Sequence, residues 1–320
     1  MRRAGAWLQR MSDEGTQPDA DLLREMILAC GRHGFPRRAN RYLDELAELG
    51  VEIDHPVFSA LVAAHSAQGN ATGAFHWFLQ MQQAALSPTV VEYTALIYCC
   101  ARNGDVEGAE QWFNRMQEAG ITADGQTYLA LIRADLGRRR NGLRAAERRL
   151  RSMERAEVRP PAEVFEVLID AHASAAEVAE AERWFEEMKA QGHSPTQAAY
   201  EGLLRACGRA GWTARAEGWL EATETAGFKL GPASYDAMVQ AYANSGRTGD
   251  ARRWLESMGK RRFKPALASF HALLADCEKT LDAGFAVSCL RRIKEAGRVP
   301  DASVYARVLA ACAARHHPDP

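Results

Sequence analysis

The most chemically distinctive stretch of the sequence is a run of arginines between Arg133 and Arg155. It holds nine arginines against three carboxylates, which gives it a net charge of +6. Such a surface could attract the phosphates of a polyanion or the acidic face of another protein. The same pattern is also typical of a solvated helix face on an irregular segment, and the sequence leaves both interpretations open.

Cysteines are the next candidates for chemistry. The chain has seven, and no Cys-x-x-Cys or His-x-Glu motif occurs, which excludes the usual zinc-finger and zinc-deaminase patterns. We expect the thiols to pack between helices and stay free, as in a reducing compartment. The histidines His65 and His172 share one recurring position with five of them, which are Cys30, Cys100, Cys207, Cys277 and Cys312.

Motifs for catalysis are missing from the sequence. No glycine-rich phosphate loop or nucleophile elbow occurs, so we expect no enzyme activity, no cofactor, no metal and no small-molecule substrate. The composition, with 47% apolar and 25% charged residues and a net charge of −1, excludes a disordered or collagen-like chain. No apolar run reaches about 20 residues, so no membrane contact is expected.

An internal period fixes where these side chains recur. Small residues repeat every 35 residues, with one interval of 37, and large apolar residues follow three and four positions later, often with a methionine at seven. This spacing is one face of an α-helix, which we assign to the protein interior. The period is marked by Ala39, Ala74, Ala109, Ala146, Ala181, Ala216, Ala251 and Ala286.

A second helix is predicted in each period, because another apolar stretch begins near a Tyr or Phe and ends at a glycine. Each unit is therefore a helical hairpin, and the two extra residues of the 37-residue unit fall in its turn, between Gly137 and Gly142. Stacked hairpins bury a continuous core, so we predict an all-α, right-handed α-solenoid of residues 1–320. Its repeats are 20–54, 55–89, 90–124, 125–161, 162–196, 197–231, 232–266 and 267–301, with half repeats at 1–19 and 302–320.

The unit resembles the pentatricopeptide repeat. Residues 90–124 match that pattern along their full length, with Tyr near the start of the first helix, Gly at the turn and Ala-x-x-Trp-Phe-x-x-Met in the second helix. The nearest alternative, the tetratricopeptide repeat, has a period of about 34 and a Trp-x-x-Leu-Gly start that these first helices lack.

The resemblance implies single-stranded RNA binding, one nucleotide per repeat, in a chloroplast or mitochondrion. In the family the fifth and last residues of a repeat, here called the reading pair, read the base, and the second residue packs on it. Only Thr94 with Asp124 matches a familiar pairing, one that favours guanine, and Val91 is the matching second residue. The other reading pairs are Arg24 with Asp54, Ser59 with Thr89, Leu129 with Pro161, Glu166 with Thr196, Glu201 with Gly231, Asp236 with Ala266, and His271 with Asp301.

Phosphate contacts are expected from basic residues near the ends of the first helices and from the arginine run. The candidates are Arg32, Arg102, Arg138, Arg209 and Lys279. No targeting peptide is visible in this chain, so the organelle rests on the resemblance alone.

Three consecutive reading pairs depart from the family pattern. Glu166, Glu201 and Asp236 place carboxylates where they would repel phosphates, although a carboxylate can accept a hydrogen bond from the amino group of cytosine. The alternative function is therefore a protein-interaction scaffold associated with a ribosome or another complex. A protein partner could also dock at the uncapped ends of the solenoid.

Overall fold

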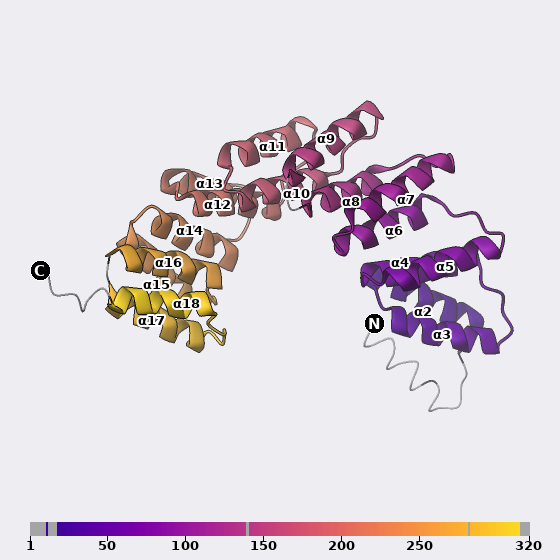
Figure 1. The fold of residues 1–320 in the computed structure, drawn as a ribbon, viewed down its shortest axis with the longest axis horizontal. Coiled ribbons are helices and arrows are strands. Elements are labelled where there is room, and N and C mark those ends of the chain that lie inside the picture. Colours follow the sequence, from indigo (N-terminus) through magenta and orange to yellow (C-terminus); the bar gives the residue numbers. More distant parts are fainter. Residues whose placement is uncertain (1–10, 12–17, 139–140, 281, 314–320) are drawn as a thin grey trace, which may run out of the picture. The chain divides into compact units, whose positions relative to one another are not determined.

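The computed structural model describes residue 11 and residues 18–138, 141–280 and 282–313. Within these ranges every regular element is a helix, from α2 (Ala20–His33) to α18 (Ala302–Ala313) (Figure 1). The chain divides into two compact units, residues 1–164 and 165–320, with the boundary inside α10. The all-α prediction is confirmed. The prediction that residues 1–320 form one array concerns both units together and stays a prediction.

The helices alternate between a first and a second member of each repeat. The first helices are α2 (Ala20–His33), α4 (His55–Ala67), α6 (Val90–Arg102), α8 (Gly125–Leu136), α10 (Ala162–Ser174), α12 (Gln197–Ala210), α14 (Pro232–Asn244), α16 (Leu267–Thr280) and α18 (Ala302–Ala313). The second helices are α3 (Pro36–Glu48), α5 (Ala71–Gln83), α7 (Val106–Glu118), α9 (Gly142–Arg155), α11 (Val178–Ala190), α13 (Thr213–Thr225), α15 (Thr248–Lys260) and α17 (Ala283–Glu295).

The predicted half repeats are described to different extents. The segment 302–320 provides a first helix, α18, and its residues 314–320 lie outside the described part. Most of the segment 1–19 also lies outside the described residues. The 37-residue repeat places five residues between α8 and α9, whereas other repeats such as 90–124 place three between first and second helix. The two extra residues are therefore in this turn, as predicted.

Several first helices begin where the side chain of the last residue of the preceding repeat caps them. Asp54 is the N-cap of α4 and accepts a 3.2 Å hydrogen bond from the backbone N–H of Val57, and Asp124 caps α8 through Thr127 in the same way at 2.8 Å. A capping side chain satisfies one of the four N–H groups that have no partner within the helix. The residue expected to read a base therefore also starts the next helix.

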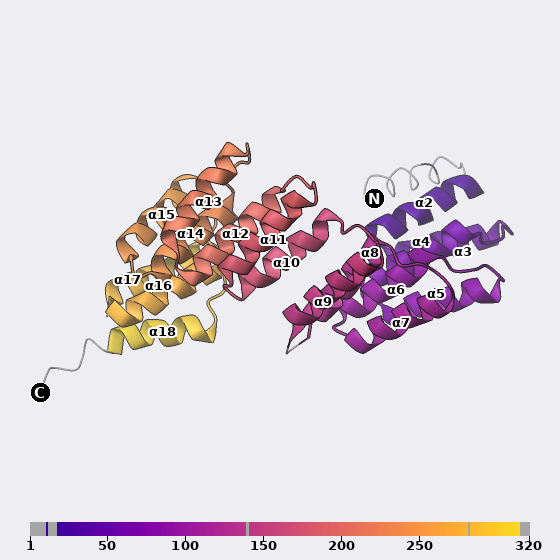
Figure 2. The same cartoon turned by 90° about the horizontal axis from the view of Figure 1, so that it is seen from above.

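Packing within each unit brings the first helices side by side. In unit 1 α2, α4, α6 and α8 contact one another in turn, and in unit 2 α12, α14, α16 and α18 do so (Figure 2). The approach is closest where Gly31 meets Ala60 and Gly208 meets Ala237. A Cβ added to either glycine would lie 2.8 or 2.7 Å from the backbone of the next first helix. Small residues at these points set the spacing between neighbouring repeats.

The apolar stripe of the second helices is core, as predicted. The period alanines are 0% exposed, and Phe78, Phe113 and Phe185 are buried beneath half-exposed tryptophans. Phe78 meets Tyr93 and Trp112 edge to face, with ring centroids 5.3 and 5.2 Å away. This geometry is a preferred one for aromatic pairs. The contacts join the repeat 55–89 to the repeat 90–124.

Candidate nucleic-acid interface

Within each unit the reading pairs lie at the N-terminal ends of the first helices, and we call this part of a unit its reading edge. The fifth residue of a repeat lies one turn into its first helix, and the last residue immediately precedes the following first helix. Because first helices lie side by side, two residues about 30 positions apart in sequence become neighbours. In six of the eight repeats, a contact joins the two members directly or through a third residue.

Three reading pairs contact each other directly through their side chains. The Arg24 guanidinium lies 3.7 Å from the Asp54 carboxylate. Thr196 donates a 2.5 Å hydrogen bond to Glu166, and His271 Nε2 lies 3.2 Å from Asp301 Oδ2. The N–H groups of Val304 and Ser303, the charge of His271 and its hydrogen bond together lower the pKa of Asp301, with the Val304 N–H contributing most.

Two reading pairs of unit 1 are joined through a third side chain. Thr94 Oγ1 lies 2.6 Å from Thr127 Oγ1, which in turn lies 2.8 Å from Asp124 Oδ1. In the preceding repeat both Ser59 and Thr89 donate to the carboxylate of Glu92. The Thr94 and Asp124 pair that the sequence singles out is thus assembled in one network.

Carboxylates occupy the fifth position of the first three repeats in unit 2. Besides Glu166, Glu201 accepts from Gln197 at 2.8 Å, and Asp236 accepts from the backbone N–H of Ala266 at 2.8 Å. Burial raises the pKa of Asp236 above its ordinary value, although the hydrogen bonds from Ser269 and Ala266 act against it. The carboxylate oxygens of these acids therefore already accept hydrogen bonds from groups of the protein.

The remaining reading pair and the second positions differ from these. Leu129 is buried at 3% exposure, and no polar contact joins it to Pro161. All eight second residues are exposed, and Val91 has the largest exposed apolar side chain among them, at 55%. An exposed valine beside Thr94 and Asp124 can pack on the flat face of a base.

Models of the pentatricopeptide repeat match nearly the whole sequence. A PPR repeat family model matches residues 88–134, a pentatricopeptide repeat domain model matches 41–103 and 148–210, a pentatricopeptide repeat-containing protein model matches 197–318, and a PPR repeat model matches 26–51. Together they span residues 26–134 and 148–318. The chain belongs to the pentatricopeptide repeat family.

Solved structures of pentatricopeptide repeat proteins share this fold. The crystal structure of PPR10 in complex with an 18-nucleotide psaJ RNA element has a TM-score of 0.74 and 22% identity over 98% of this chain. The crystal structure of PPR10 from maize has a TM-score of 0.51 at the same identity and coverage. The chain spans 45% and 44% of those two proteins. None of the curated proteins compared with the chain matches its sequence.

Two of the predicted phosphate contacts also link neighbouring pentatricopeptide repeats. Arg102 donates to the backbone carbonyl of Ala67, and Arg209 donates to that of Ser174 at 3.1 Å, in each case 35 residues back. Both guanidinium groups remain exposed, as do Arg32 and Lys279 at the same repeat position. This position lies eight residues beyond the reading position, or about 12 Å along the helix axis.

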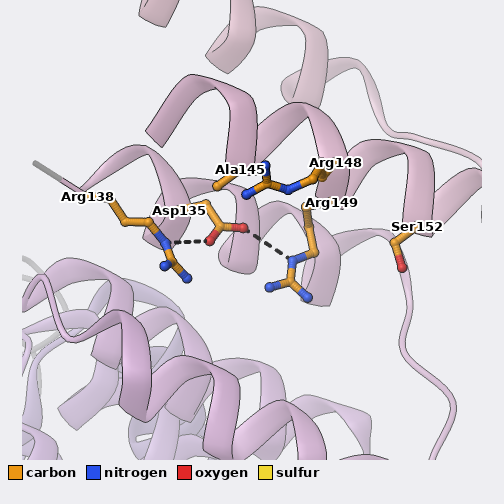
Figure 3. A pocket seen from close by; sticks show the side chains of 6 residues that line it. All are labelled: Asp135, Arg138, Ala145, Arg148, Arg149 and Ser152. Carbon is orange, nitrogen blue, oxygen red and sulfur yellow. Dashed lines mark hydrogen bonds and ion pairs between the residues drawn. The ribbon is translucent and has the colours of Figure 1, made fainter. Parts of the chain in front are cut away.

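Arg138 stands apart from this row and lines a pocket between α8 and α9 (Figure 3). Arg138 and Arg149 approach the Asp135 carboxylate from two sides, with Nε atoms 3.1 and 3.3 Å from its oxygens. Burial alone lowers the pKa of Arg149, but Glu110 and Asp135 outweigh it and leave that pKa raised. The pocket of about 260 Å³ also includes Arg148. Its arginines are partly neutralised by the two carboxylates.

Sequence reasoning did not identify the structural role of Asp135 or of three buried polar residues near the reading pairs of this pentatricopeptide repeat chain. Asp135 holds the repeat position that elsewhere carries a cysteine, histidine or tyrosine, so aligning the repeats would have exposed it. Glu92, Thr127 and Ser269 are third residues of their repeats, are 0% exposed and contact the preceding reading pair. A polar residue at a position that is otherwise apolar was the available signal.

The cysteine prediction is confirmed for the thiols themselves. All seven are free, and six are buried. Burial raises the pKa of Cys207 and of Cys289 to about 12, and that of Cys100 to about 11. At neutral pH these thiols are protonated, and a protonated thiol is a poor nucleophile.

Proposed function

We propose that this pentatricopeptide repeat protein binds single-stranded RNA along its reading edge, with one nucleotide facing each repeat. It would act without catalysis, by sequestering an RNA segment and so changing its processing, stability or translation. Family resemblance favours a chloroplast or mitochondrial transcript. Thr94 and Asp124 are the residues that we assign to a base, and Val91 would pack against it.

One observation carries this proposal: the fifth and last residues converge at the reading edge although they are far apart in sequence. A hydroxyl and a carboxylate held together in this way can contact the edge of an unstacked base. The exposed Val91 supplies an apolar contact beside them, since its exposure is 55%. Exposed Arg32, Arg102, Arg209 and Lys279 recur at one repeat position and would contact phosphates.

A protein-interaction scaffold is the second candidate, favoured by the acidic reading positions of unit 2. Glu166 and Asp236 already accept hydrogen bonds from the protein, which leaves them less available to a base. The apolar face of α18 also fits a protein partner. Leu309 is 68% exposed, whereas Leu274 at the same position of α16 is 0% exposed. The partner would be a helix with the apolar pattern of the second helices.

Filter binding to a randomised single-stranded RNA pool at several salt concentrations tests RNA binding. We expect affinity to fall steeply with salt, by roughly 0.7 logarithmic units per phosphate contact for each tenfold rise. No binding above the non-specific level at low salt would rule the function out. A stoichiometric protein partner that survives nuclease treatment would favour the scaffold.

The substitution Thr94→Asn tests the assigned base contact. An amide offers both donor and acceptor where the hydroxyl stood, so the preferred base at one ligand position should change, with total affinity altered less than about tenfold. Sequencing of the bound RNA measures this. The matched control is Thr72→Asn, because Thr72 is exposed on the second helix α5. An unchanged preference with Thr94→Asn would remove Thr94 from the interface.

A further inference from the structure

The third residue of a repeat is buried against the reading pair of the repeat before it. This residue is polar and hydrogen-bonded to that pair in three repeats, where it is Glu92, Thr127 or Ser269. Each of the three is 0% exposed. No incoming nucleotide can reach such a side chain, but the side chain can determine what the reading pair offers.

Repeats with an apolar third residue provide the contrast. Where Val57, Ala199 or Val304 occupies this place, the two members of the preceding reading pair contact each other directly. Where Val164 occupies it, the preceding pair Leu129 and Pro161 makes no polar contact. Ser234 is a polar third residue whose side chain makes no hydrogen bond to the preceding reading pair. That pair ends in Gly231, which has no side chain. The hydroxyl of Ser234 has no partner, and the side chain is buried. Glu92 and Thr127 stand between both members of their reading pairs, whereas Ser269 bonds only one member, Asp236, which also accepts directly from the Ala266 N–H.

Counting protons shows what this intervention does in the repeat 90–124. A hydroxyl has one proton to donate and two lone pairs to accept. Thr127 donates its proton to Asp124, with the oxygens 2.8 Å apart. The 2.6 Å contact between Thr94 and Thr127 must then use the proton of Thr94. Thr94 is left to accept, and the Asp124 carboxylate can only accept.

In the repeat 55–89 the reading pair can also only accept hydrogen bonds, although the third residue beside it is a glutamate. Ser59 donates to one oxygen of the buried Glu92 carboxylate, and Thr89 donates to the other at 2.7 Å. A carboxylate has no proton to give back, so both reading hydroxyls can only accept. Two neighbouring repeats thus present acceptors alone, although threonine and serine can normally do either.

We propose that the buried third residues Glu92 and Thr127 are positioning residues that take up the protons of the reading hydroxyls and so make their reading pairs select bases with hydrogen-bond donors. This inference rests on the proposed RNA binding. Guanine fits two adjacent acceptors best, because its Watson–Crick edge carries an imino and an amino donor side by side. Bases that place an acceptor there are rejected, since two acceptors facing each other leave both without a partner.

The substitution Thr127→Val tests this inference, because valine has nearly the shape of threonine and lacks the hydroxyl. The Thr94 hydroxyl regains its proton and can then donate to a base as well as accept. Selection from a randomised single-stranded RNA pool should show preference at one ligand position reduced by roughly three- to tenfold, with overall affinity changed much less. Thr127→Ser, which keeps the hydroxyl, should restore the preference.

Thr223→Val is the matched control. Thr223 is also buried, and its hydroxyl bonds to the backbone of Trp219 on the second helix α13, away from the reading edge. It should leave every base preference unchanged. If Thr127→Val fails to fold by circular dichroism, Glu92→Gln gives a second measurement. Its amide donates into the Ser59 and Thr89 pair, so one hydroxyl there is freed and preference at the adjacent ligand position falls.

The outcomes separate the two proposals. Wild-type protein that selects no base at any position overturns the RNA-binding function, and this inference with it. Wild-type protein that selects bases, together with Thr127→Val or Glu92→Gln variants that select them equally well, overturns only the role of the third residue. A relaxed preference with Thr127→Val that Thr127→Ser restores supports the inference.

Discussion

The reading edges of the two units share one geometry and differ in chemistry. In unit 1 the repeats 55–89 and 90–124 present hydroxyls, with Thr94 paired to Asp124 and Val91 exposed beside them. In unit 2 Glu166, Glu201 and Asp236 bring carboxylates to the same place. If RNA binds here as proposed, we expect backbone and packing to set where a base lies, and the charge of the fifth residue to determine how closely a phosphate can approach.

From this difference we expect the two units to contribute unequally to the proposed RNA binding. Phosphates are attracted by exposed cations and repelled by uncompensated carboxylates at close range, and both effects weaken as salt increases. The carboxylates of unit 2 accept hydrogen bonds from the uncharged groups of Thr196, Gln197 and Ala266, which do not neutralise a negative charge. Unit 1 is accordingly the expected RNA-binding part of the chain.

Neutralising the acids of unit 2 should have the largest effect on this comparison. In a variant carrying Glu166→Gln, Glu201→Gln and Asp236→Asn, single-stranded RNA should bind roughly 10- to 100-fold more tightly at low salt, since each like-charge contact near 4 Å costs about 1 kcal/mol in water. Filter binding at two salt concentrations measures the gain, which should shrink as salt rises.

The control for that variant removes the same charge elsewhere in unit 2. Glu221, Glu224 and Glu256 are exposed on the second helices α13 and α15. Their change to glutamine should raise affinity by much less, because they lie away from the reading edge. Equal gains from both variants would mean that net charge, and not position, governs RNA binding.

The fold was predictable from sequence because it is repeated. One helical face recurs eight times, so errors in a single unit are averaged out, and the turn of the 37-residue repeat could be placed by counting. The contacts of the reading pairs were not predictable in the same way. Whether Thr94 meets Asp124 directly or through Thr127 depends on one buried hydroxyl 33 residues away, and no local pattern records that choice.

Two buried groups, His65 in unit 1 and Asp236 in unit 2, should make stability depend on pH in opposite directions. In unit 1 burial, with a smaller contribution from His76, lowers the pKa of His65. The folded unit then binds fewer protons than the unfolded chain, so its free energy of unfolding falls as pH drops through 6.5. In unit 2 burial raises the pKa of Asp236, so the free energy of unfolding falls as pH rises above about 3.8.

Hydrogen exchange followed by mass spectrometry can resolve these changes unit by unit between pH 4 and 8. His65→Gln should flatten the dependence in α4 and α5, and Asp236→Asn should flatten it in α14. His33→Gln replaces an exposed histidine of unit 1 and should leave the profile of α4 and α5 as it is. A profile of α4 and α5 that His65→Gln does not alter would assign the dependence to other groups.

The smallest expected effect is on the free energy of unfolding, and it should be equal in the two units. It depends on the backbone conformation of the turn after the second helices, which both units share. Second helices end at a residue with positive φ, usually glycine, but Ala85 in unit 1 and Arg262 in unit 2 adopt φ of 59° there. A residue with a Cβ pays about 1–2 kcal/mol for this conformation, and glycine regains part of that as unfolded-chain entropy. Ala85→Gly and Arg262→Gly should each stabilise the protein by about 0.5–1 kcal/mol, measured by urea unfolding.

The control is Ala84→Gly, one residue earlier, where φ is −75°. This substitution should destabilise the protein instead. If Ala85→Gly and Ala84→Gly change stability in the same direction, backbone conformation is not the cause, and the similarity of the two units at this turn has no energetic consequence.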